Sequence, residues 1–261
     1  MPTDDIERFR LLAPDTAAHR MPARGMSQAG HRAMSLLSGA RDRFILGENR
    51  FGLRPDLGLV ASMVEPGSRI LDVGCGDGAL LDYLVRENGC DGRGMEISQA
   101  GVNACVARGL PAVQGDADRH LVDYPDDSFD YVILSHTLQA VHRPGEVLHQ
   151  MMRIADVAIV SILNFGHWRA RLSMVTRGRM PHTRFLPEPW FMTSTIRPCT
   201  VRDFMDLVRL EGLLTGDCYG IANEREVTVI RSGFEGQSNL FAEQAVFEVL
   251  PAKRRKPGRR S

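Results

Sequence analysis

Residues 70–78 read ILDVGCGDG, an apolar run that holds one acid, Asp72, and then passes into a turn with three glycines in five residues. This pattern is typical of a buried strand that ends beside a ligand, because glycine lets the backbone turn sharply and approach a bound molecule closely. A carboxylate so near the turn would repel a phosphate. The stretch therefore raises the question of which ligand accepts a negative charge at this position.

The residues around this stretch alternate between short apolar runs and segments with helical spacing. Such alternation predicts a parallel sheet with crossover helices, and hence a doubly wound α/β domain. Ser98 and Thr200 are placed to cap two of the helices, and a third helix is expected over 144–155. The expected strands cover residues 68–73, 92–97, 112–116, 129–135 and 157–162, with further β-prone runs at 213–231 and an antiparallel final edge at 242–250.

The 261 residues are 43% hydrophobic, which is enough for one substantial core. Weak periodicity over residues 1–50 predicts an N-terminal extension, disordered or partly helical, before a domain of residues 51–252. Residues 253–261, KRRKPGRRS, predict a basic, solvated tail. Because no apolar run has membrane-spanning length and no secretion signal precedes the domain, we expect a cytoplasmic protein without a membrane anchor.

Composition also limits the partners. The five cysteines form no CxxC pair and are odd in number, which disfavours a structural zinc site and a disulfide framework, so no bound metal is expected. The formal net charge is zero, and six positive charges lie in the tail, so the domain itself is acidic. Binding of nucleic acid by the domain is therefore unlikely on charge alone.

Two more acids follow the next strands. Glu96 lies twenty residues after Gly76, at a strand end where a carboxylate can accept hydrogen bonds from both hydroxyls of a ribose. Asp116 can accept from the amine of an adenine, and Ala117 can donate its backbone N–H to a ring nitrogen. Asp116 alone could equally cap a turn. Together these positions predict a site for an adenosine-type ligand.

The charge of Asp72 distinguishes two such ligands. Residues 74–79 complete a G-x-G-x-x-A dinucleotide pattern, so NAD is one alternative. Asp72 disfavours its pyrophosphate, whereas the ammonium and sulfonium groups of S-adenosylmethionine would be attracted. We therefore predict S-adenosylmethionine or S-adenosylhomocysteine as the cofactor. The predicted binding residues are Asp72, Gly74, Cys75, Gly76, Gly78, Glu96, Ile97, Asp116, Ala117 and Ser135.

This set resembles the class I methyltransferase superfamily, and longer strings over about residues 52–250 resemble the family of the methionine biosynthesis protein MetW. The strings are LRPDL, LDVGCGDG, DDSFDYVILSHTLQAVHRP, NFGHWRARL, RGRMP and NLFAEQAVFEV. The resemblance implies a mostly parallel, seven-stranded Rossmann-like methyltransferase sheet with an antiparallel edge strand. It also implies a role in methionine biosynthesis, in which the family partners a MetX-like homoserine O-acyltransferase on a separate chain and supports its activity.

The chain does not keep the family pattern at every position. Before the last predicted helix the family has Asn-Ile-His-x-Cys-Thr, where this chain has Arg197 in place of the histidine. No role of that histidine is carried over. The G-x-S-x-G elbow of an acyltransferase is also absent from the sequence, so we do not expect this chain to acylate homoserine alone.

Two further features bear on activity. His136 follows the strand at 129–135 and is the candidate base for methyl transfer, although a histidine held by backbone contacts is the alternative. His142 is expected to be an exposed residue at a helix start. An insert at about 163–190 is basic and aromatic. The chain has no acidic residue between Asp156, which precedes the insert, and Glu188 near its end. The insert predicts a helical lid or a docking surface, with a solvated arginine face as the alternative.

Two functional hypotheses follow. In the first, the domain binds S-adenosylmethionine and acts as an accessory or regulatory subunit of a homoserine O-acyltransferase. In the second, the chain is an independent class I S-adenosylmethionine-dependent methyltransferase of a small-molecule or protein acceptor, whose carboxylates the arginines of the insert would bind.

Overall fold

A computed structural model describes residues 43–45, 53–181, 189–193, 197–223, 225–231 and 235–252. The basic tail lies outside the described residues, as does the predicted N-terminal extension apart from residues 43–45. Part of the predicted insert, residues 182–188, is outside them as well.

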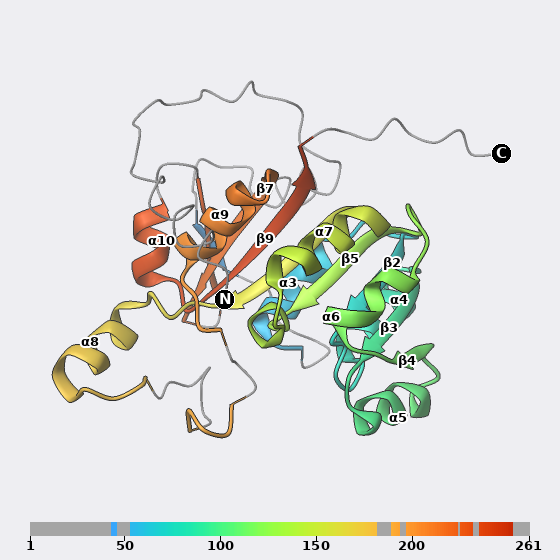
Figure 1. Cartoon of the computed structure of the whole chain (residues 1–261), viewed down its shortest axis with the longest axis horizontal. Helices are drawn as coiled ribbons and strands as arrows, with labels where there is room; N and C mark the ends of the chain where they lie inside the picture. Colours follow the sequence, from blue (N-terminus) through green and yellow to red (C-terminus); the bar gives the residue numbers. More distant parts are fainter. Residues whose placement is uncertain are drawn as a thin grey trace.

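The described strands form one nine-stranded sheet in the order β1-β8-β7-β9-β6-β5-β2-β3-β4 (Figure 1). The pairs β2–β3, β3–β4, β2–β5 and β5–β6 are all parallel. The strands are β1 (Arg43–Ile45), β2 (Arg69–Val73), β3 (Asp91–Glu96), β4 (Ala112–Gln114), β5 (Phe129–Ser135), β6 (Ala155–Leu163), β7 (Leu213–Ala222), β8 (Glu226–Val229) and β9 (Gln244–Pro251). The doubly wound, Rossmann-like α/β class predicted from the sequence is thus confirmed.

The last part of the sheet is antiparallel. β9 lies between β6 and β7 and pairs antiparallel with both, so β7 runs in the same direction as β6. A turn at Asn223, whose φ is 47°, leads from β7 back into β8, and β1 pairs with β8. The sheet therefore has two strands more than the predicted seven. The antiparallel edge consists of β8 and β1, whereas β9 is an interior strand.

Helices cover the two faces of the sheet because residues along the buried strands alternate between them. Ile70, Ile133 and Val246 pack on one face with α3, α4 and α5. Leu71, Val132 and Phe247, their chain neighbours, pack on the other face with α7 and α9. The described helices are α3 (Pro55–Met63), α4 (Ala79–Arg86), α5 (Gln99–Ala107), α6 (Ala117–His120), α7 (Pro144–Ile154), α8 (Trp168–Arg177), α9 (Val201–Leu210) and α10 (Glu235–Phe241), with 3-10 turns η1 (Leu121–Asp123) and η2 (Leu138–Ala140).

The predicted helix caps are present. The Ser98 hydroxyl accepts a hydrogen bond from the Gly101 N–H at 3.0 Å and begins α5. Thr200 and Asp203 form a reciprocal capping box at the start of α9, which satisfies two backbone N–H groups at the helix end. Among the described residues, no helix is both long and apolar enough to cross a membrane.

Candidate functional site

The glycine loop connects β2 to α4 at the carboxyl end of the parallel strands. Gly74, Gly76 and Gly78 all have positive φ, at 74°, 58° and 79°, which an L-residue adopts only with strain. Gly74 has a second constraint, because a Cβ at this position would overlap the Thr137 side chain. The Gly74 and Cys75 N–H groups both donate to the Met95 carbonyl, at 2.7 and 3.2 Å. The loop is thus tied to the end of β3.

Glu96 makes the strongest connection between the loop and β3. Its Oε2 accepts from the Gly76 N–H and its Oε1 from the Ser98 N–H, both at 2.9 Å. Each carboxylate oxygen has two lone pairs, so both oxygens can still accept from a ligand hydroxyl. The sequence predicted Glu96 as a ligand contact. The structure adds that this carboxylate orders the two loops that surround it.

Asp72 is the penultimate residue of β2 and is 2% exposed. Its pKa is raised to about 7, chiefly by burial; the positive charge of Arg54 opposes this shift and the neighbouring Glu96 adds to it. A buried acid with a raised pKa favours a cationic partner, because a nearby positive charge stabilises its ionised form. This environment is the one expected for a carboxylate that faces a charged ligand.

The carboxyl ends of β5, β2, β3 and β4 form one row, which we call the rim. Asp116 and Ala117 follow β4, the last strand of this row. The Gly115 N–H donates to the Glu96 carbonyl at 3.0 Å, which brings this segment against the end of β3. Asp116 is the N-cap of α6, and its Oδ1 accepts from the Asp118 N–H at 3.0 Å. The capping role that the sequence left open is therefore present, and the second carboxylate oxygen pairs with the Nε of the exposed Arg119 at 3.7 Å.

Two other predicted residues complete the β2 to β4 side. Ile97 follows Glu96 and is 66% exposed, so it offers an apolar surface beside the rim. Cys75 is buried, and its Sγ lies 3.7 Å from the Sγ of Cys105. Burial raises the pKa of both thiols, which keeps them neutral and makes them packing residues.

A second polar cluster lies where β5 and β6 end, and its centre is Asp56. This residue is in the first turn of α3, and its side chain is fully buried. Its Oδ2 accepts from the Ser135 hydroxyl at 3.0 Å, the Ser161 hydroxyl at 3.4 Å and the Arg54 Nη2 at 3.2 Å. Its Oδ1 is buried without a hydrogen-bond partner among the described residues. Ser135, predicted as a ligand contact, is therefore also a support for this carboxylate.

His136 completes the cluster. Its Nε2 is 3.4 Å from the Asp56 Oδ2, and its backbone N–H donates to the Ser161 carbonyl at 3.1 Å. Its φ of 54° places a non-glycine residue in the left-handed region, which costs about 1–2 kcal/mol. Burial lowers the pKa of His136 and the charge of Asp56 opposes this shift. The lowered pKa favours the neutral imidazole, whose Nε2 lies near the Asp56 carboxylate but has no hydrogen-bond partner among the described residues.

Asp56 and Arg54 were missed as site residues by sequence reasoning. The string LRPDL marks a helix start, since proline is favoured in the first turn, but nothing in it reveals that the acid is buried. A weak signal was present in the strands. Ser135 and Ser161 are opposite each other in the parallel β5–β6 pair and interrupt apolar runs, which calls for a polar partner between them.

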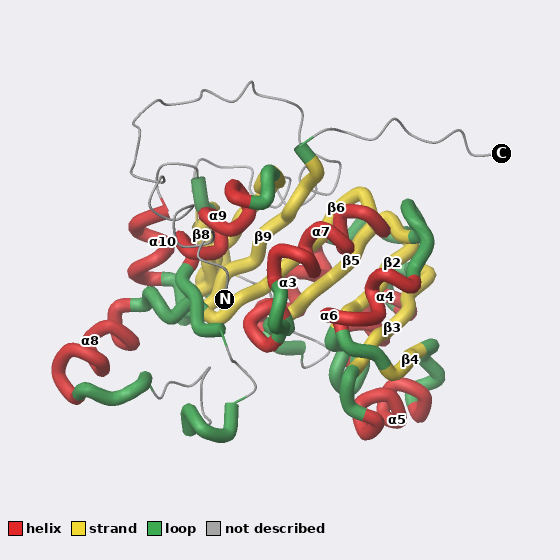
Figure 2. Tube along the Cα trace, in the orientation of Figure 1, coloured by secondary structure: helices red, strands yellow, loops and turns green. Residues whose placement is uncertain are grey.

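The predicted insert contains α8, which we call the α8 arm and define as residues 168–181. Figures 1 and 2 show it set apart from the sheet, on the opposite side of the molecule from α4 and α5. Its described part therefore does not cover the glycine loop. Only Ala170 is buried in α8, whereas Leu172 and Val175 are 50% and 84% exposed.

The base of the α8 arm is firmly held. The Asn164 Nδ2 donates to the carbonyls of Asn239 and Ala242, at 3.0 and 2.7 Å. His167 is buried and is the N-cap of α8, where its Nδ1 accepts from the Arg169 N–H. Asn164 and His167 thus anchor the start of the arm.

Two positions outside the rim have structural roles. Arg197, at the position where the family pattern has histidine, donates from Nε to the Val141 carbonyl at 3.1 Å and from Nη2 to the His142 carbonyl at 2.6 Å. His142 is exposed, as predicted, and its backbone N–H donates to the Asp118 carboxylate. Both contacts fix the turn before α7.

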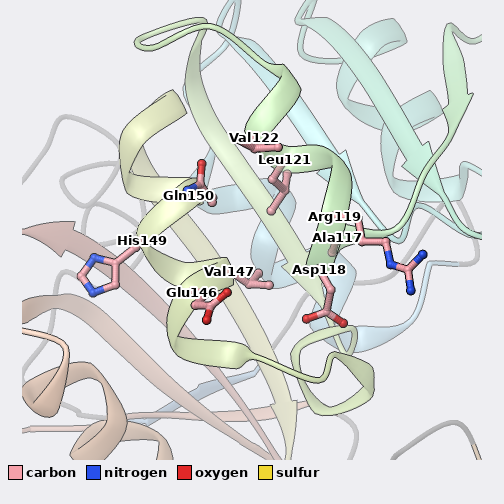
Figure 3. A pocket seen from close by; sticks show the side chains of 9 residues that line it. All are labelled: Ala117, Asp118, Arg119, Leu121, Val122, Glu146, Val147, His149 and Gln150. Atoms are coloured by element: carbon pink, nitrogen blue, oxygen red, sulfur yellow. The ribbon is translucent and has the colours of Figure 1, made fainter.

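A pocket of about 420 Å³ opens between α6, η1 and α7 (Figure 3). Its charged groups are engaged elsewhere: Asp118 accepts from the Arg143 N–H, and the His149 Nε2 is 2.8 Å from the Glu211 carboxylate. Of the predicted binding residues only Ala117 lines it, so we do not place the ligand there. The lining residues are Ala117, Asp118, Arg119, Leu121, Val122, Glu146, Val147, His149 and Gln150.

Comparison with known proteins decides the family. A family model described as methionine biosynthesis protein MetW matches residues 54–249, which include the whole rim and the α8 arm. The chain belongs to the MetW family. A bifunctional methionine biosynthesis protein MetXA/MetW of Rhodopirellula baltica is 34% identical over 158 residues, which are 57% of this chain and 25% of that longer protein. This MetW-family chain thus corresponds to a quarter of the length of that relative.

Solved structures show the same fold. A SAM-dependent methyltransferase of Thermotoga maritima has a TM-score of 0.55 at 18% identity, and the match covers 75% of this chain and 87% of that one. The [4+2]-cyclase SpnF has a TM-score of 0.53 at 16% identity, with 86% and 94% covered. A fold shared by a methyltransferase and a cyclase does not by itself fix the reaction of this MetW-family chain.

Proposed function

We propose that this MetW-family chain binds S-adenosylmethionine or S-adenosylhomocysteine at the carboxyl ends of β5, β2, β3 and β4 and serves as an accessory, regulatory subunit of a homoserine O-acyltransferase. The observation that carries the ligand is the buried carboxylate of Asp72 beside a glycine loop. A cationic sulfur nucleoside lowers the cost of ionising this acid, whereas a pyrophosphate raises it.

The rest of the rim suits the nucleoside. Glu96 keeps free lone pairs for the ribose hydroxyls. The Asp116 Oδ2 lies 3.7 Å from the exposed Arg119 Nε and can still accept from the adenine amine. Ile97 offers exposed apolar surface on which an adenine ring can pack. The remaining predicted contacts, Gly74, Gly76, Gly78, Cys75, Ala117 and Ser135, either form the loop or lie at the adjoining strand ends.

The proposal of a MetX-like partner is supported by the Rhodopirellula baltica relative, a single protein whose name joins MetXA and MetW. Covalent fusion raises the effective concentration of one module for the other and is favourable when the two act together. In the present protein the MetX-like part would be a separate chain, joined by noncovalent contacts.

The α8 arm is the surface we assign to that contact. Trp168, Leu172 and Val175 are exposed on α8, and the arm carries Arg169 and Arg177 with no acid. Exposed aromatic and aliphatic residues with arginine are typical of the core of a protein interface. An acidic, apolar groove on the acyltransferase would complement it.

Because the ligand is made from methionine, its binding would report the output of the pathway. A ligand changes the activity of a complex only through unequal affinity for two of its states. Homoserine acylation is therefore measured for the acyltransferase alone, with this chain, and with this chain plus S-adenosylmethionine. We expect the chain to raise the rate and the ligand to change it, whereas equal rates in all three mixtures would remove the accessory role.

The independent methyltransferase stays as the second candidate, because a histidine with a lowered pKa lies beside a buried carboxylate at the end of β5. The pair His136 and Asp56 could accept a proton from a methyl acceptor. Transfer of labelled methyl groups to any acceptor in an extract, abolished by His136→Asn, would favour this function. Asparagine tolerates the positive φ at this position and so keeps the backbone intact.

A further inference from the structure

Arg54 occupies the one end of the rim to which no ligand group has been assigned. It is the N-cap residue of α3, and its Nη2 donates to the Ser135 hydroxyl at 3.1 Å and to the Asp56 carboxylate at 3.2 Å. Both acceptors belong to well-packed parts of the chain, since Ser135 ends a central strand and the Asp56 side chain is fully buried. The guanidinium is therefore fixed at the carboxyl end of β5.

The outer side of this guanidinium remains accessible. The Arg54 side chain is 55% exposed although the carboxylate that holds it is completely buried. Within the described part of the chain, its hydrogen bonds come from Nη2 alone. Arginine has five N–H donors in a planar fork, so a second edge is left for a carboxylate, which it can bind through two parallel hydrogen bonds.

Arg54 is also close enough to Asp72 to affect its ionisation. β5 and β2 are neighbours, with Asp72 opposite Ile133, two residues before Ser135. The positive charge of Arg54 lowers the pKa of Asp72, against the effect of burial. Two adjacent strand ends thus present one fixed cation and one buried acid, a pair that matches the carboxylate and ammonium of an α-amino acid.

The order of these groups along the sheet agrees with one class of ligand. From β5 through β2 and β3 to β4 the rim presents Arg54, Asp72, Glu96 and Asp116. An amino-acid nucleoside presents, in the same order, a carboxylate, an ammonium and sulfur, a ribose and a base. From this order we infer that Arg54 is the receptor for the α-carboxylate of the bound nucleoside, positioned by Asp56 and Ser135, so that the site selects nucleosides that retain their amino-acid group.

This inference rests on the proposed ligand, so the test separates the two. S-adenosylhomocysteine and 5′-methylthioadenosine share the adenosine and the sulfur, but only the first has an α-amino acid. Titration calorimetry of the full chain with each compound gives the ratio of their affinities. We expect the unaltered chain to prefer S-adenosylhomocysteine, and Arg54→Gln to weaken that compound at least about tenfold while changing the other less than about twofold.

Two further variants keep the result interpretable. Arg54→Lys retains a positive charge beside Asp56 but has no planar fork, so we expect an intermediate affinity for S-adenosylhomocysteine. Arg209→Gln is the matched control, because Arg209 is also 55% exposed and also pairs with two acceptors, Asp206 and Glu235, but lies on α9. It should bind both compounds as the unaltered chain does.

The outcomes differ for the two proposals. If the unaltered chain binds neither compound, the proposed ligand itself is wrong. If it binds S-adenosylhomocysteine and Arg54→Gln leaves the ratio of affinities unchanged, or weakens both compounds equally, the ligand stands and the carboxylate receptor is overturned. Thermal unfolding of each variant confirms that it is folded under the titration conditions.

Discussion

The ligand rim and the α8 arm differ in how their residues are held. At the rim, Glu96 and Asp56 each bond several groups from different elements, and Gly74 fits against Thr137 without room for a methyl group. On the arm, Val175 is 84% exposed and only Ala170 is buried in the helix. Side chains at the rim support one another, whereas most side chains of the arm contribute little to the stability of the isolated chain.

The difference in packing between the rim and the arm corresponds to two kinds of recognition, of a small ligand and of a protein partner. A small ligand requires groups fixed on strands and helices, because a displaced donor loses its hydrogen bond. A protein partner can cover an exposed helix and bury its apolar side chains in the interface. Substitutions at the rim should therefore affect stability and ligand binding together, and substitutions at exposed positions of the arm should affect only binding to a partner. Four predictions test this separation.

The largest effect is expected at Asp56. Asp56→Ala removes a fully buried carboxylate and leaves Ser135, Ser161 and Arg54 without their common acceptor. Removing one member of a buried charged network costs about 3–5 kcal/mol, so the free energy of unfolding measured with urea should fall by about 4 kcal/mol. The control is Asp206→Ala, whose exposed pair with Arg209 contributes under about 1 kcal/mol. A loss below 1 kcal/mol at Asp56 would contradict the rigid rim.

Gly74→Ala should follow in size. The new methyl group meets the Thr137 side chain in addition to the strain of a φ of 74°, and we expect a loss of roughly 3 kcal/mol and weaker binding of S-adenosylhomocysteine. Gly109→Ala is matched in backbone conformation, with a φ of 77°, but has open space around its Cβ position. It should lose only about 1 kcal/mol. Equal losses at the two glycines would show that packing against Thr137 does not constrain the loop.

Asp72→Asn should stabilise the ligand-free chain in a pH-dependent way. The folded pKa of about 7 is above the unfolded value, so ionisation of the acid costs no stability below about pH 4, and this cost grows between about pH 4 and 7 and is constant above that range. Asparagine removes this cost, and at pH 8 the variant should be more stable by roughly 2 kcal/mol. Urea titrations at pH 4 and pH 8 measure the difference.

The same change should weaken the ligand. Calorimetry at pH 8 is expected to show at least about tenfold lower affinity of Asp72→Asn for S-adenosylmethionine, because the attraction to its positive charges is lost. Asp82→Asn is the control, since Asp82 pairs with Arg86 on the exposed side of α4. Undiminished affinity in Asp72→Asn would mean that this acid does not contribute to ligand choice.

The smallest effect on stability is expected on the arm. The double change Leu172→Ser and Val175→Ser replaces two exposed side chains, so the free energy of unfolding should stay within about 0.5 kcal/mol. Affinity for a MetX-like acyltransferase, measured by surface plasmon resonance, should fall. Ala170→Asp, at a position 2% exposed, should instead destabilise the arm. Unchanged affinity in the double variant would show that the partner contacts another surface.

Sequence reasoning predicted the strands around the glycine loop because they are short apolar runs that end in turn residues. It placed β2, β3, β5 and β6 within two residues of their observed bounds. It did not foresee β1, and it did not divide the β-prone run at 213–231 into β7 and β8, since short strands at a sheet edge have a weak hydrophobic pattern.

For the site, the sequence located acids that follow strands, such as Glu96 and Asp116, since strand ends can be predicted from the apolar pattern. It could not find Asp56 or Arg54. Their role depends on how α3 packs against the ends of β5 and β6, which is a tertiary contact between residues about 80 to 105 positions apart. The second role of Glu96, as acceptor for the Gly76 and Ser98 N–H groups, could not be predicted either, because any residue type can supply a backbone N–H.

The interior position of β9 has a consequence for synthesis of the chain. This last strand joins β6 to β7, so a nascent chain that has emerged only to residue 243 leaves an edge of each strand without its hydrogen-bonding neighbour. Unpaired edges are templates for aggregation. The sheet is completed only when the final residues of the domain have been synthesised. Until then a chaperone or a binding partner would have to cover the unpaired edges of β6 and β7.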